Sequence, residues 1–248
     1  MHLKLLDDVY LVGGQDMHLV YMDWIDNDSS VYLVDTGDTL VLVDCGCGES
    51  LGVIMNNIKE AEFDLDDISH LILTSAQYPH AGAAEAVRRM GVEIIASEAA
   101  AKALESADLL ATGAFRYGRT AVGAEVNHVA EDDEIVTIGR YDFRLLMLPG
   151  ASAGAIGVLF EIENKVTLFS GDTVLPPVYG PVVARIDYNL REEIASLERL
   201  LAEDPEVILP GHGFPCFQHG RAWIESRLTE LLERYQLRRT YEDEKPLG

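Results

Sequence analysis

A strand-loop-helix corner at residues 71–80 is the feature that most constrains how this chain folds. An apolar run at 71–73 leads into a polar loop at 74–80, and an alanine-rich pattern with helical spacing follows over 81–90. A loop at the carboxyl end of a buried strand is held by that strand while its side chains stay open to a ligand. We therefore take this corner as the first candidate functional site.

Strands and helices alternate through the first half of the chain. Short apolar or alternating runs between turn signals predict strands, and a period near 3.6 residues predicts helices. These patterns predict strands at residues 9–20, 31–35, 40–44, 68–74 and 92–96, and helices at residues 51–58, 81–90 and 98–110. Residues 111–132 lack clear periodicity and are expected to form either a connection or a lid over a site.

Strands dominate again after residue 132. The same patterns predict strands at residues 135–138, 143–148, 156–162, 166–169 and 206–209, and helices at residues 189–203 and 222–237. Two mixed β/α halves of this kind predict two sheets face to face, with helices outside and one cleft between the halves. We expect a single domain over residues 1–237, followed by a polar C-terminal tail at 238–248.

Composition argues against two classes of partner. The chain is acidic, with 19 basic and 42 acidic residues, a net charge of −23 and no cluster of Lys or Arg, so a nucleic-acid backbone would be repelled. It has no apolar run of the roughly 18 residues that a membrane helix needs. The odd count of three cysteines argues against a disulfide framework. We expect a cytoplasmic protein with a small-molecule partner, and the charged amphipathic helix predicted at 222–237 makes a homodimer reasonable.

Three loops at predicted strand ends carry side chains of the types that bind metals. His80 closes the polar loop of the corner, Asp172 lies in a Ser-Gly-Asp-Thr run, and His212 lies in a Pro-Gly-His-Gly run. Each of these residues also has an ordinary structural role, since the carboxylate can cap a turn and a histidine between glycines can bind backbone. Asp44, at the end of another predicted strand, is expected either to cap backbone amides or to support a nearby ligand shell.

This order of motifs, with a further Pro-Gly loop at 149–150, resembles the metallo-β-lactamase superfamily, in particular its glyoxalase II-like and lactonase-like members. The resemblance covers residues 9 to about 232. It implies an αββα sandwich of two mixed β-sheets with helices on the outer faces. It also implies two metal ions, usually zinc and sometimes iron or manganese, held by a Thr-His-x-His-x-Asp-His motif and by later Pro-Gly-His, Gly-Asp and Gly-His motifs.

The chain departs from that pattern at the first metal. Ser75, Gln77 and Ala151 stand where the resemblance places the three histidines of one ion, and Pro79 stands where it places an aspartate for the other. Serine and glutamine are weak neutral donors and alanine is none, so the first site is expected to be empty. We therefore expect a degenerate active site that holds one zinc or iron ion, or none.

The retained trio is a legitimate ligand set for that one ion. His80, Asp172 and His212 supply two imidazoles and one carboxylate, and zinc would accept water as a fourth ligand while iron(II) favours the same set on one face. Zinc lowers the pKa of such a water toward about 7, which permits attack on an ester, thioester or lactone. The same three residues are thus the candidate catalytic groups.

Five further residues are candidates for contact with a substrate. Ser75, Gln77 and Tyr78 lie in the corner loop itself. Tyr188 precedes a predicted helix, where lactonase-like relatives present a phenol to the substrate oxygen, although packing is the more ordinary role for it. Arg185 has the geometry to bind a carboxylate.

Three functional hypotheses follow from this site. The first is a hydrolase with at most one metal ion, acting on a small ester, thioester or lactone. The second is a pseudoenzyme whose metal-depleted cleft binds a small molecule or a partner without chemistry. The third is a divergent enzyme that carries out metal-independent or iron-dependent chemistry other than hydrolysis.

Overall fold

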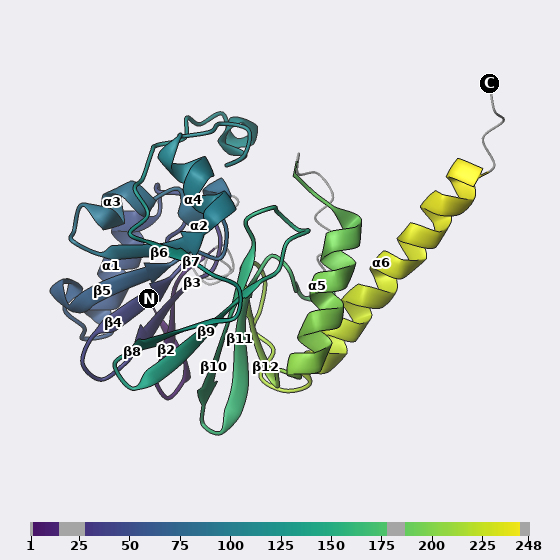
Figure 1. Cartoon of the computed structure of the whole chain (residues 1–248). Coiled ribbons are helices and arrows are strands. Elements are labelled where there is room, and N and C mark those ends of the chain that lie inside the picture. The colour runs from purple at the N-terminus through teal and green to yellow at the C-terminus, as the bar shows by residue number, and fades with distance from the viewer. Residues whose placement is uncertain (1, 15–27, 178–186, 244–248) are drawn as a thin grey trace.

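Two β-sheets lie face to face, and helices cover the outer face of each (Figure 1). The computed structural model describes residues 2–14, 28–177 and 187–243. The αββα sandwich of two mixed sheets that the sequence predicts is confirmed by this arrangement. Within the described residues, no helix combines the length and apolarity that a bilayer crossing requires.

Over the described part of the chain, the first sheet has seven strands that lie side by side in chain order. Strands β1 to β4 run antiparallel and β4 to β7 run parallel. Their bounds are β1 Leu3–Leu6, β2 Val9–Gly13, β3 Val31–Asp35, β4 Leu40–Val43, β5 Ile68–Ile72, β6 Glu93–Ser97 and β7 His128–Ala130. Strands β3 and β4 are buried on both faces, so their sequences are continuous apolar runs rather than alternating ones.

The second sheet, as far as the chain is described, has five strands in the order β12-β11-β10-β9-β8. Strands β8 to β11 form the antiparallel array that the sequence predicts, and β12 adds to it in parallel with β11. Their bounds are β8 Glu134–Ile138, β9 Tyr141–Met147, β10 Ile156–Ile162, β11 Lys165–Gly171 and β12 Val207–Pro210. Because β11 and β12 are parallel neighbours, the loops that follow them leave the sheet at the same edge.

Among the residues that the structure describes, six α-helices cover the two sheets: α1 Leu51–Glu60, α2 Tyr78–Ala81, α3 Ala84–Arg88, α4 Glu98–Glu105, α5 Leu190–Glu203 and α6 Gly220–Asp243. The first four lie on the first sheet, and α5 and α6 pack together over the second (Figure 1). Three apolar clusters fill the layers between helices and sheets and between the two sheets. The central cluster includes Phe143, Phe160 and Phe169, and the rings of the latter two stack at 5.3 Å. This packed centre fixes the strand ends from which the site is built.

The continuous helix predicted over residues 81–90 is wrong, because two short helices, α2 and α3, replace it. The Ala83 amide donates to the Gly46 carbonyl at 3.2 Å instead of continuing the helix, and the Pro79 carbonyl accepts from the Ser29 amide. Gly82, between the two helices, lies so close to the 45–48 loop that a Cβ there would approach the Cys47 carbonyl to 2.5 Å. Hydrogen bonds to segments far away in sequence therefore break the helix.

Several predicted boundaries also shift. The helix predicted to end at residue 110 ends at Glu105, and β7 lies within the segment predicted as a connection. Helix α6 continues to Asp243, past the predicted start of the tail at residue 238. Of the strand predicted over 9–20, β2 ends at Gly13, and residues 15–20 lie outside the described part of the chain. The domain boundary at residue 237 stays a prediction.

Candidate functional site

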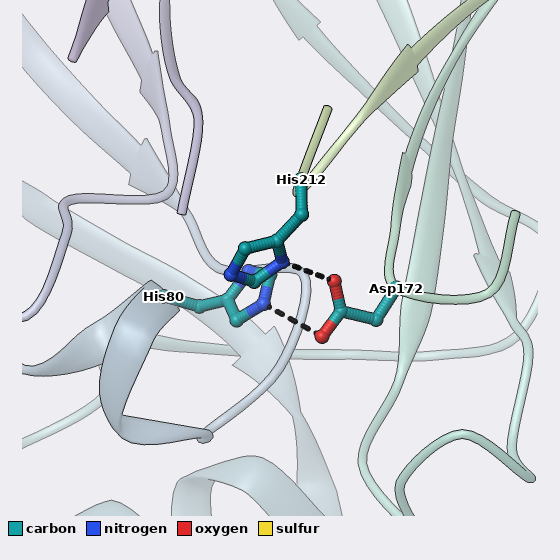
Figure 2. Close-up of side chains that lie close together, drawn as sticks. All are labelled: His80, Asp172 and His212. Atoms are coloured by element: carbon teal, nitrogen blue, oxygen red, sulfur yellow. Dashed lines mark hydrogen bonds and ion pairs between the residues drawn. The ribbon is translucent and has the colours of Figure 1, made fainter. Parts of the chain in front are cut away.

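His80, Asp172 and His212 converge at the strand ends of the two sheets (Figure 2). His80 Nε2 lies 3.1 Å from Asp172 Oδ2, and His212 Nδ1 lies 2.8 Å from Asp172 Oδ1. One ligand atom from each residue falls within 4.8 Å of the others, and the two imidazole rings meet edge to face at 5.4 Å between centroids. The structure thus brings together the three residues that the motifs single out.

Each of the three comes from a different element, and hydrogen bonds between the loops hold them in place. His80 lies in α2, Asp172 directly follows β11, and His212 follows β12. The Gly211 amide donates to the Gly171 carbonyl at 2.7 Å, which ties the last two loops together. Across the sandwich, the hydroxyl of Tyr32 in β3 donates to the Pro210 carbonyl at 2.7 Å. The site is therefore supported by both sheets.

Asp44 orients His80. It accepts hydrogen bonds from the Thr74 amide at 2.8 Å and the Thr74 hydroxyl at 2.7 Å, and its Oδ2 lies 2.7 Å from His80 Nδ1. The two roles considered for Asp44 from the sequence are thus both present, since it caps a backbone amide and supports the candidate ligand. A carboxylate on one nitrogen of a ligating histidine fixes the ring and leaves the other nitrogen for the metal.

The two carboxylates also set the protonation of His80. Complete burial by itself lowers the pKa of this imidazole, but the charges of Asp172 and Asp44 outweigh burial and raise the pKa to about 10. With a proton on each nitrogen, the ring donates to Asp44 on one side and to Asp172 on the other. A cation that binds at Nε2 must therefore displace a proton from His80.

Glycine at two positions makes the close packing of the trio possible. Gly171 has a φ of +51°, and a Cβ there would lie 2.7 Å from the Thr74 hydroxyl. A Cβ at Gly211 would lie 2.5 Å from His80 Cε1 and 2.9 Å from Asp172 Oδ1. The glycines that precede Asp172 and His212 in the sequence thus leave room for the side chains of the site.

The donor set fits one metal ion. His80 is fixed by Asp44 with Nε2 facing Asp172, and the trio supplies the imidazole and carboxylate donors that zinc and iron(II) accept. Over the described residues, this is the one group of at least three His, Cys, Asp or Glu side chains close enough to hold an ion. Its side chains range from 0% exposed for His80 to 16% for His212, so His212 is the member most open to solvent.

Ser75, Gln77 and Ala151 stand where the resemblance places the first set of histidines, and the first two are engaged in hydrogen bonds within the protein. The Ser75 hydroxyl accepts from the Gln77 amide at 3.3 Å, and the Gln77 side chain donates to the Ala111 carbonyl at 2.7 Å. Ala151 is buried and offers no donor side chain. The Gln77 amide thus anchors the start of the connection at 111–132, and a role in substrate contact for Ser75 or Gln77 stays a prediction.

The connection packs on the loop that carries His80. The Tyr78 amide donates to the Thr112 carbonyl at 2.8 Å, and the Tyr78 ring stacks on Tyr117 with centroids 5.5 Å apart. Partial burial and the nearby Cys47 and Glu49 raise the pKa of Tyr78. Tyr78 is therefore held between the site loop and the connection, while remaining partly open to solvent.

Tyr188 packs near the contact between α5 and α6. Its hydroxyl is buried beside Glu193, and burial together with the charge and hydrogen bond of Glu193 raises the pKa of Tyr188. Glu193 is fully buried and pairs with Arg227 of α6 at 2.6 Å. These contacts favour the packing role over the substrate role for Tyr188. Arg185, the other predicted substrate contact, lies outside the described residues.

Asp28 is a residue near the site that the sequence interpretation missed. It is 1% exposed and accepts a hydrogen bond from the Cys47 amide at 2.7 Å, and burial raises its pKa. The amides of Ser29 and Ser30 donate to the carbonyls of Pro79 and Gly211. The available signal was a polar Asp-Ser-Ser run directly before the largely apolar strand β3, but no periodicity shows that such a run is buried.

Comparison with known proteins agrees with this architecture. The sequence model of the family described as Metallo-beta-lactamase superfamily matches residues 24–212. The hydroxyacylglutathione hydrolase GloC of Haemophilus influenzae is 31% identical over 164 residues, which cover 64% of this chain and 74% of that protein. The probable metallo-hydrolase YqgX of Bacillus subtilis is 26% identical over 146 residues, covering 58% of this chain and 67% of that protein.

Solved structures resemble the whole chain. A metallo-beta-lactamase with a HARLDQ motif from Cronobacter sakazakii gives a TM-score of 0.77 at 19% identity, covering 98% of this chain and 96% of that one. The subclass B3 metallo-beta-lactamase BJP-1 of Bradyrhizobium japonicum gives a TM-score of 0.73 at 21% identity, covering 98% and 96%. At these identities the likeness establishes the fold and leaves the chemistry to the residues of the site.

Proposed function

This chain belongs to the metallo-beta-lactamase superfamily, and from that premise we propose that it hydrolyses a small ester, thioester or lactone with one metal ion held by His80, Asp172 and His212. The observation that carries the proposal is the convergence of these three side chains within 4.8 Å, with the carboxylate between the two imidazoles. The resemblance of part of the chain to a hydroxyacylglutathione hydrolase favours a thioester among the three substrate classes.

Zinc or iron(II) is the ion that this donor set suits. Such an ion, when bound, acts as a Lewis acid toward a carbonyl group and lowers the pKa of water. The protein's own contribution is to hold the donors rigid: Thr74 holds Asp44, Asp44 holds His80 Nδ1, and the Gly171–Gly211 hydrogen bond joins the other two loops. Rigid support of this kind keeps ligand geometry from being lost to side-chain motion.

The exposure of the three residues indicates the direction of substrate approach. His80 and Asp172 have side chains that are 0% and 4% exposed, whereas His212 is 16% exposed and lies two residues before the exposed Phe214. A substrate therefore reaches the trio from the side of His212. Tyr78, stacked on Tyr117 at the edge of the connection, is the best-placed of the predicted contacts in the corner loop to line that approach.

A second candidate function, ligand binding without chemistry, is favoured by a specific observation. His80, Asp172 and His212 already satisfy one another by hydrogen bonds, and the proton on His80 supplies positive charge between two buried carboxylates. The Gln77 side chain is likewise engaged by the protein backbone. Side chains that pair with one another in this way need no metal ion to balance their charges, as a pseudoenzyme would require.

Hydrolysis assays on the purified chain separate the two functions. We expect turnover of a panel of thioesters, aryl esters and lactones by zinc- or iron(II)-loaded protein, and loss of turnover on treatment with a chelator. His212→Ala should abolish turnover, while His128→Ala, which alters an exposed histidine paired with Glu134, should not. Turnover that survives both the chelator and His212→Ala would exclude the metal-dependent hydrolase.

Iron-dependent chemistry other than hydrolysis remains the third proposal, motivated by the selective loss of the first histidine set. Anaerobic reconstitution with iron(II) followed by an oxygen-uptake assay tests it, and no uptake with any candidate substrate would leave it without support. We also propose a cytoplasmic location, with which the free thiols of Cys45, Cys47 and Cys216 agree. A homodimer through α6 is a further proposal that sedimentation of the intact chain would test.

A further inference from the structure

A cavity of about 610 Å³ lies beside the loop that joins β9 to β10, and none of its lining residues belongs to the trio. The start of α4, the strand β7 with the two residues after it, and the loop itself form its walls. Its apolar lining includes Ala99, Ala130, Met147, Pro149, Ala153 and Ala155. Four of these six are alanines, whose small side chains leave the space open. A volume of this size falls within the range of roughly 300 to 1,000 Å³ that small-molecule sites have.

The cavity lies at the same edge of the sandwich as the trio. Strands β5 and β6 are parallel, so the segment after β6 leaves the first sheet where the corner loop leaves β5. In the second sheet β9 and β11 point the same way, because each is antiparallel to β10. Met147, at the end of β9, therefore lies at the edge where Asp172 follows β11. The cavity and the trio thus share the edge at which this fold presents its loops.

Hydrogen bonds hold the loop wall of the cavity in place. The Ser97 hydroxyl donates to the Gly154 carbonyl at 2.8 Å, and the Asn189 amide donates to the Gly150 carbonyl at 2.9 Å. A Cβ at Gly154 would lie 2.8 Å from the Ala100 amide nitrogen, so glycine lets the loop pack directly on α4. The loop is therefore fastened to α4 on one side and to the start of α5 on the other. Small-molecule sites are usually preformed in this way.

The rim of the cavity is acidic. Glu98, Glu131 and Asp132 line it with exposed side chains. Two of these carboxylates have a cation, since Glu98 pairs with Lys102 and Asp132 pairs with Arg199. Across residues 2–14, 28–177 and 187–243, no cation pairs with the carboxylate of Glu131. One negative charge at the rim is therefore left unbalanced.

The surroundings of Glu131 indicate which kind of cation fits. The rim carboxylates do not form a group close enough to chelate a metal ion, as far as the described side chains show. The apolar lining favours a ligand that buries hydrocarbon. The net charge of −23 favours a cation over an anion as the charged part of that ligand. An organic cation with an apolar body meets both requirements.

We propose that this cavity binds a small organic ammonium ion, with the ammonium group against Glu131 and the hydrocarbon body on the alanines around Ala153. The site is distinct from the trio and does not depend on a metal ion bound there. It therefore gives the protein a second ligand, beyond the substrate of the proposed hydrolysis.

Backbone amide shifts of the isotope-labelled full chain, followed by NMR during titration, test the proposal. The three probes are phenylbutylammonium, phenylbutanol and phenylbutyrate, which share one hydrocarbon body and differ in charge. We expect saturable shifts at the amides of the lining residues. The ammonium probe should bind roughly fivefold more tightly than the alcohol, because an exposed ion pair contributes about that factor at most. Phenylbutyrate should bind more weakly than the alcohol.

Two variants separate the charge from the cavity. Glu131→Gln keeps the shape of the side chain and removes its charge, so the ammonium probe should lose most of its preference while the alcohol binds as before. Ala153→Leu fills part of the cavity and should weaken the binding of both probes by about tenfold or more, as added bulk does in an apolar pocket.

Glu161→Gln and Ala222→Leu are the matched controls. Glu161 is exposed near the end of β10 that is far from the cavity, and Ala222 is exposed in α6. Each control makes the same chemical change outside the cavity, so both should bind the three probes as the unaltered chain does. Glu161→Gln also shows whether net charge alone causes the preference. Urea unfolding of each variant verifies that the fold is retained.

Several outcomes would overturn the inference. One is an ammonium probe that binds no more tightly than the alcohol, and another is a set of shifts that do not saturate or that centre on amides outside the lining. Unchanged affinity in Ala153→Leu, or an equal loss of preference in Glu131→Gln and Glu161→Gln, would do the same. These binding measurements do not involve the trio, so their failure leaves the proposed function untouched.

Discussion

Gly211→Ala is expected to damage both the stability and the metal affinity of this protein. The added Cβ would lie 2.5 Å from His80 Cε1 and 2.9 Å from Asp172 Oδ1, whereas carbon atoms in contact are usually about 3.5 to 4.0 Å apart. The His80 ring is 0% exposed and is held on both nitrogens, at 2.7 and 3.1 Å, so it has no free direction in which to move. The site must therefore open by about an ångström.

The size of the effect follows from that displacement. Overpacking of a close-packed interior costs about 1 to 3 kcal/mol, which urea unfolding of the variant should show as a lower midpoint. Metal ligands tolerate displacements of only about 0.2 Å, so zinc affinity measured by chelator competition should fall by about tenfold or more. Both losses share one cause, the contact between position 211 and the trio.

Gly52→Ala is the control for this substitution. Nothing lies within 4 Å of a Cβ at Gly52, an exposed position inside α1. Because Gly52 lies in the first turn of α1, alanine there should stabilise the protein by less than the roughly 0.5 to 1 kcal/mol of a mid-helix position, and it should leave zinc affinity unchanged. If Gly211→Ala unfolds at the same urea concentration as the unaltered chain and binds zinc equally well, the close packing described around His80 is incorrect.

Three further predictions concern the groups that support the site. Asp44→Asn should weaken zinc binding by roughly tenfold to a hundredfold in the chelator competition, because His80 loses the carboxylate that orients it. Zinc affinity should rise by about tenfold per pH unit between pH 7 and 9, since His80, with a pKa of about 10, must release a proton to bind the ion. Arg227→Ala should lower the free energy of unfolding by about 3 to 5 kcal/mol because it leaves Glu193 charged and buried, while zinc affinity per folded molecule should not change.

A specific result would contradict each of these three predictions. Unchanged zinc affinity in Asp44→Asn would show that the Asp44–His80 hydrogen bond does not orient a ligand. A zinc affinity that is flat over that pH range would show that the ion does not compete with a proton on His80. Urea unfolding of Arg227→Ala at the midpoint of the unaltered chain would show that the Glu193–Arg227 pair is not a significant part of the α5–α6 contact.

The raised pKa of His80, caused by Asp44 and Asp172, also predicts how the free energy of unfolding varies with pH. A pKa raised from about 6.5 in the unfolded chain to about 10 in the fold contributes stability that is fully present below pH 6.5. That contribution is lost as the pH rises from about 6.5 through 10. Thermal unfolding of chelator-treated protein should therefore occur at lower temperature as the pH rises across this range, and His80→Gln should remove the dependence.

Many strands of this fold could be predicted because the apolar pattern of each segment matches its burial in the folded protein. The apolar runs at 31–35 and 40–43 match β3 and β4, which are buried on both faces. From the sequence, only the resemblance of their motifs to a known superfamily groups Asp172 with His212, and the structure shows why they meet, since each follows one of two neighbouring parallel strands. The same resemblance supplies His80, the partner from the first sheet.

The misses come from contacts that no local pattern contains. The split between α2 and α3 depends on the Gly46 carbonyl, which takes the Ala83 amide from a distant loop. The sequence does not show that the Gln77 side-chain amide donates to the carbonyl of Ala111, 34 residues away. Asp28 is buried only because Cys47 and the two histidine loops close around it. The helix break, the hydrogen bond of Gln77 and the burial of Asp28 all depend on contacts between segments that are distant in the sequence.

The number of metal ions bound per chain is the most direct test of the account. Zinc titration of the chelator-treated, tag-free protein at neutral pH, with elemental analysis after gel filtration, should give one ion per chain. His212→Ala should give none, because only two ligands of the trio would remain. Two ions per chain, or an unaltered stoichiometry in His212→Ala, would contradict a single site built from His80, Asp172 and His212.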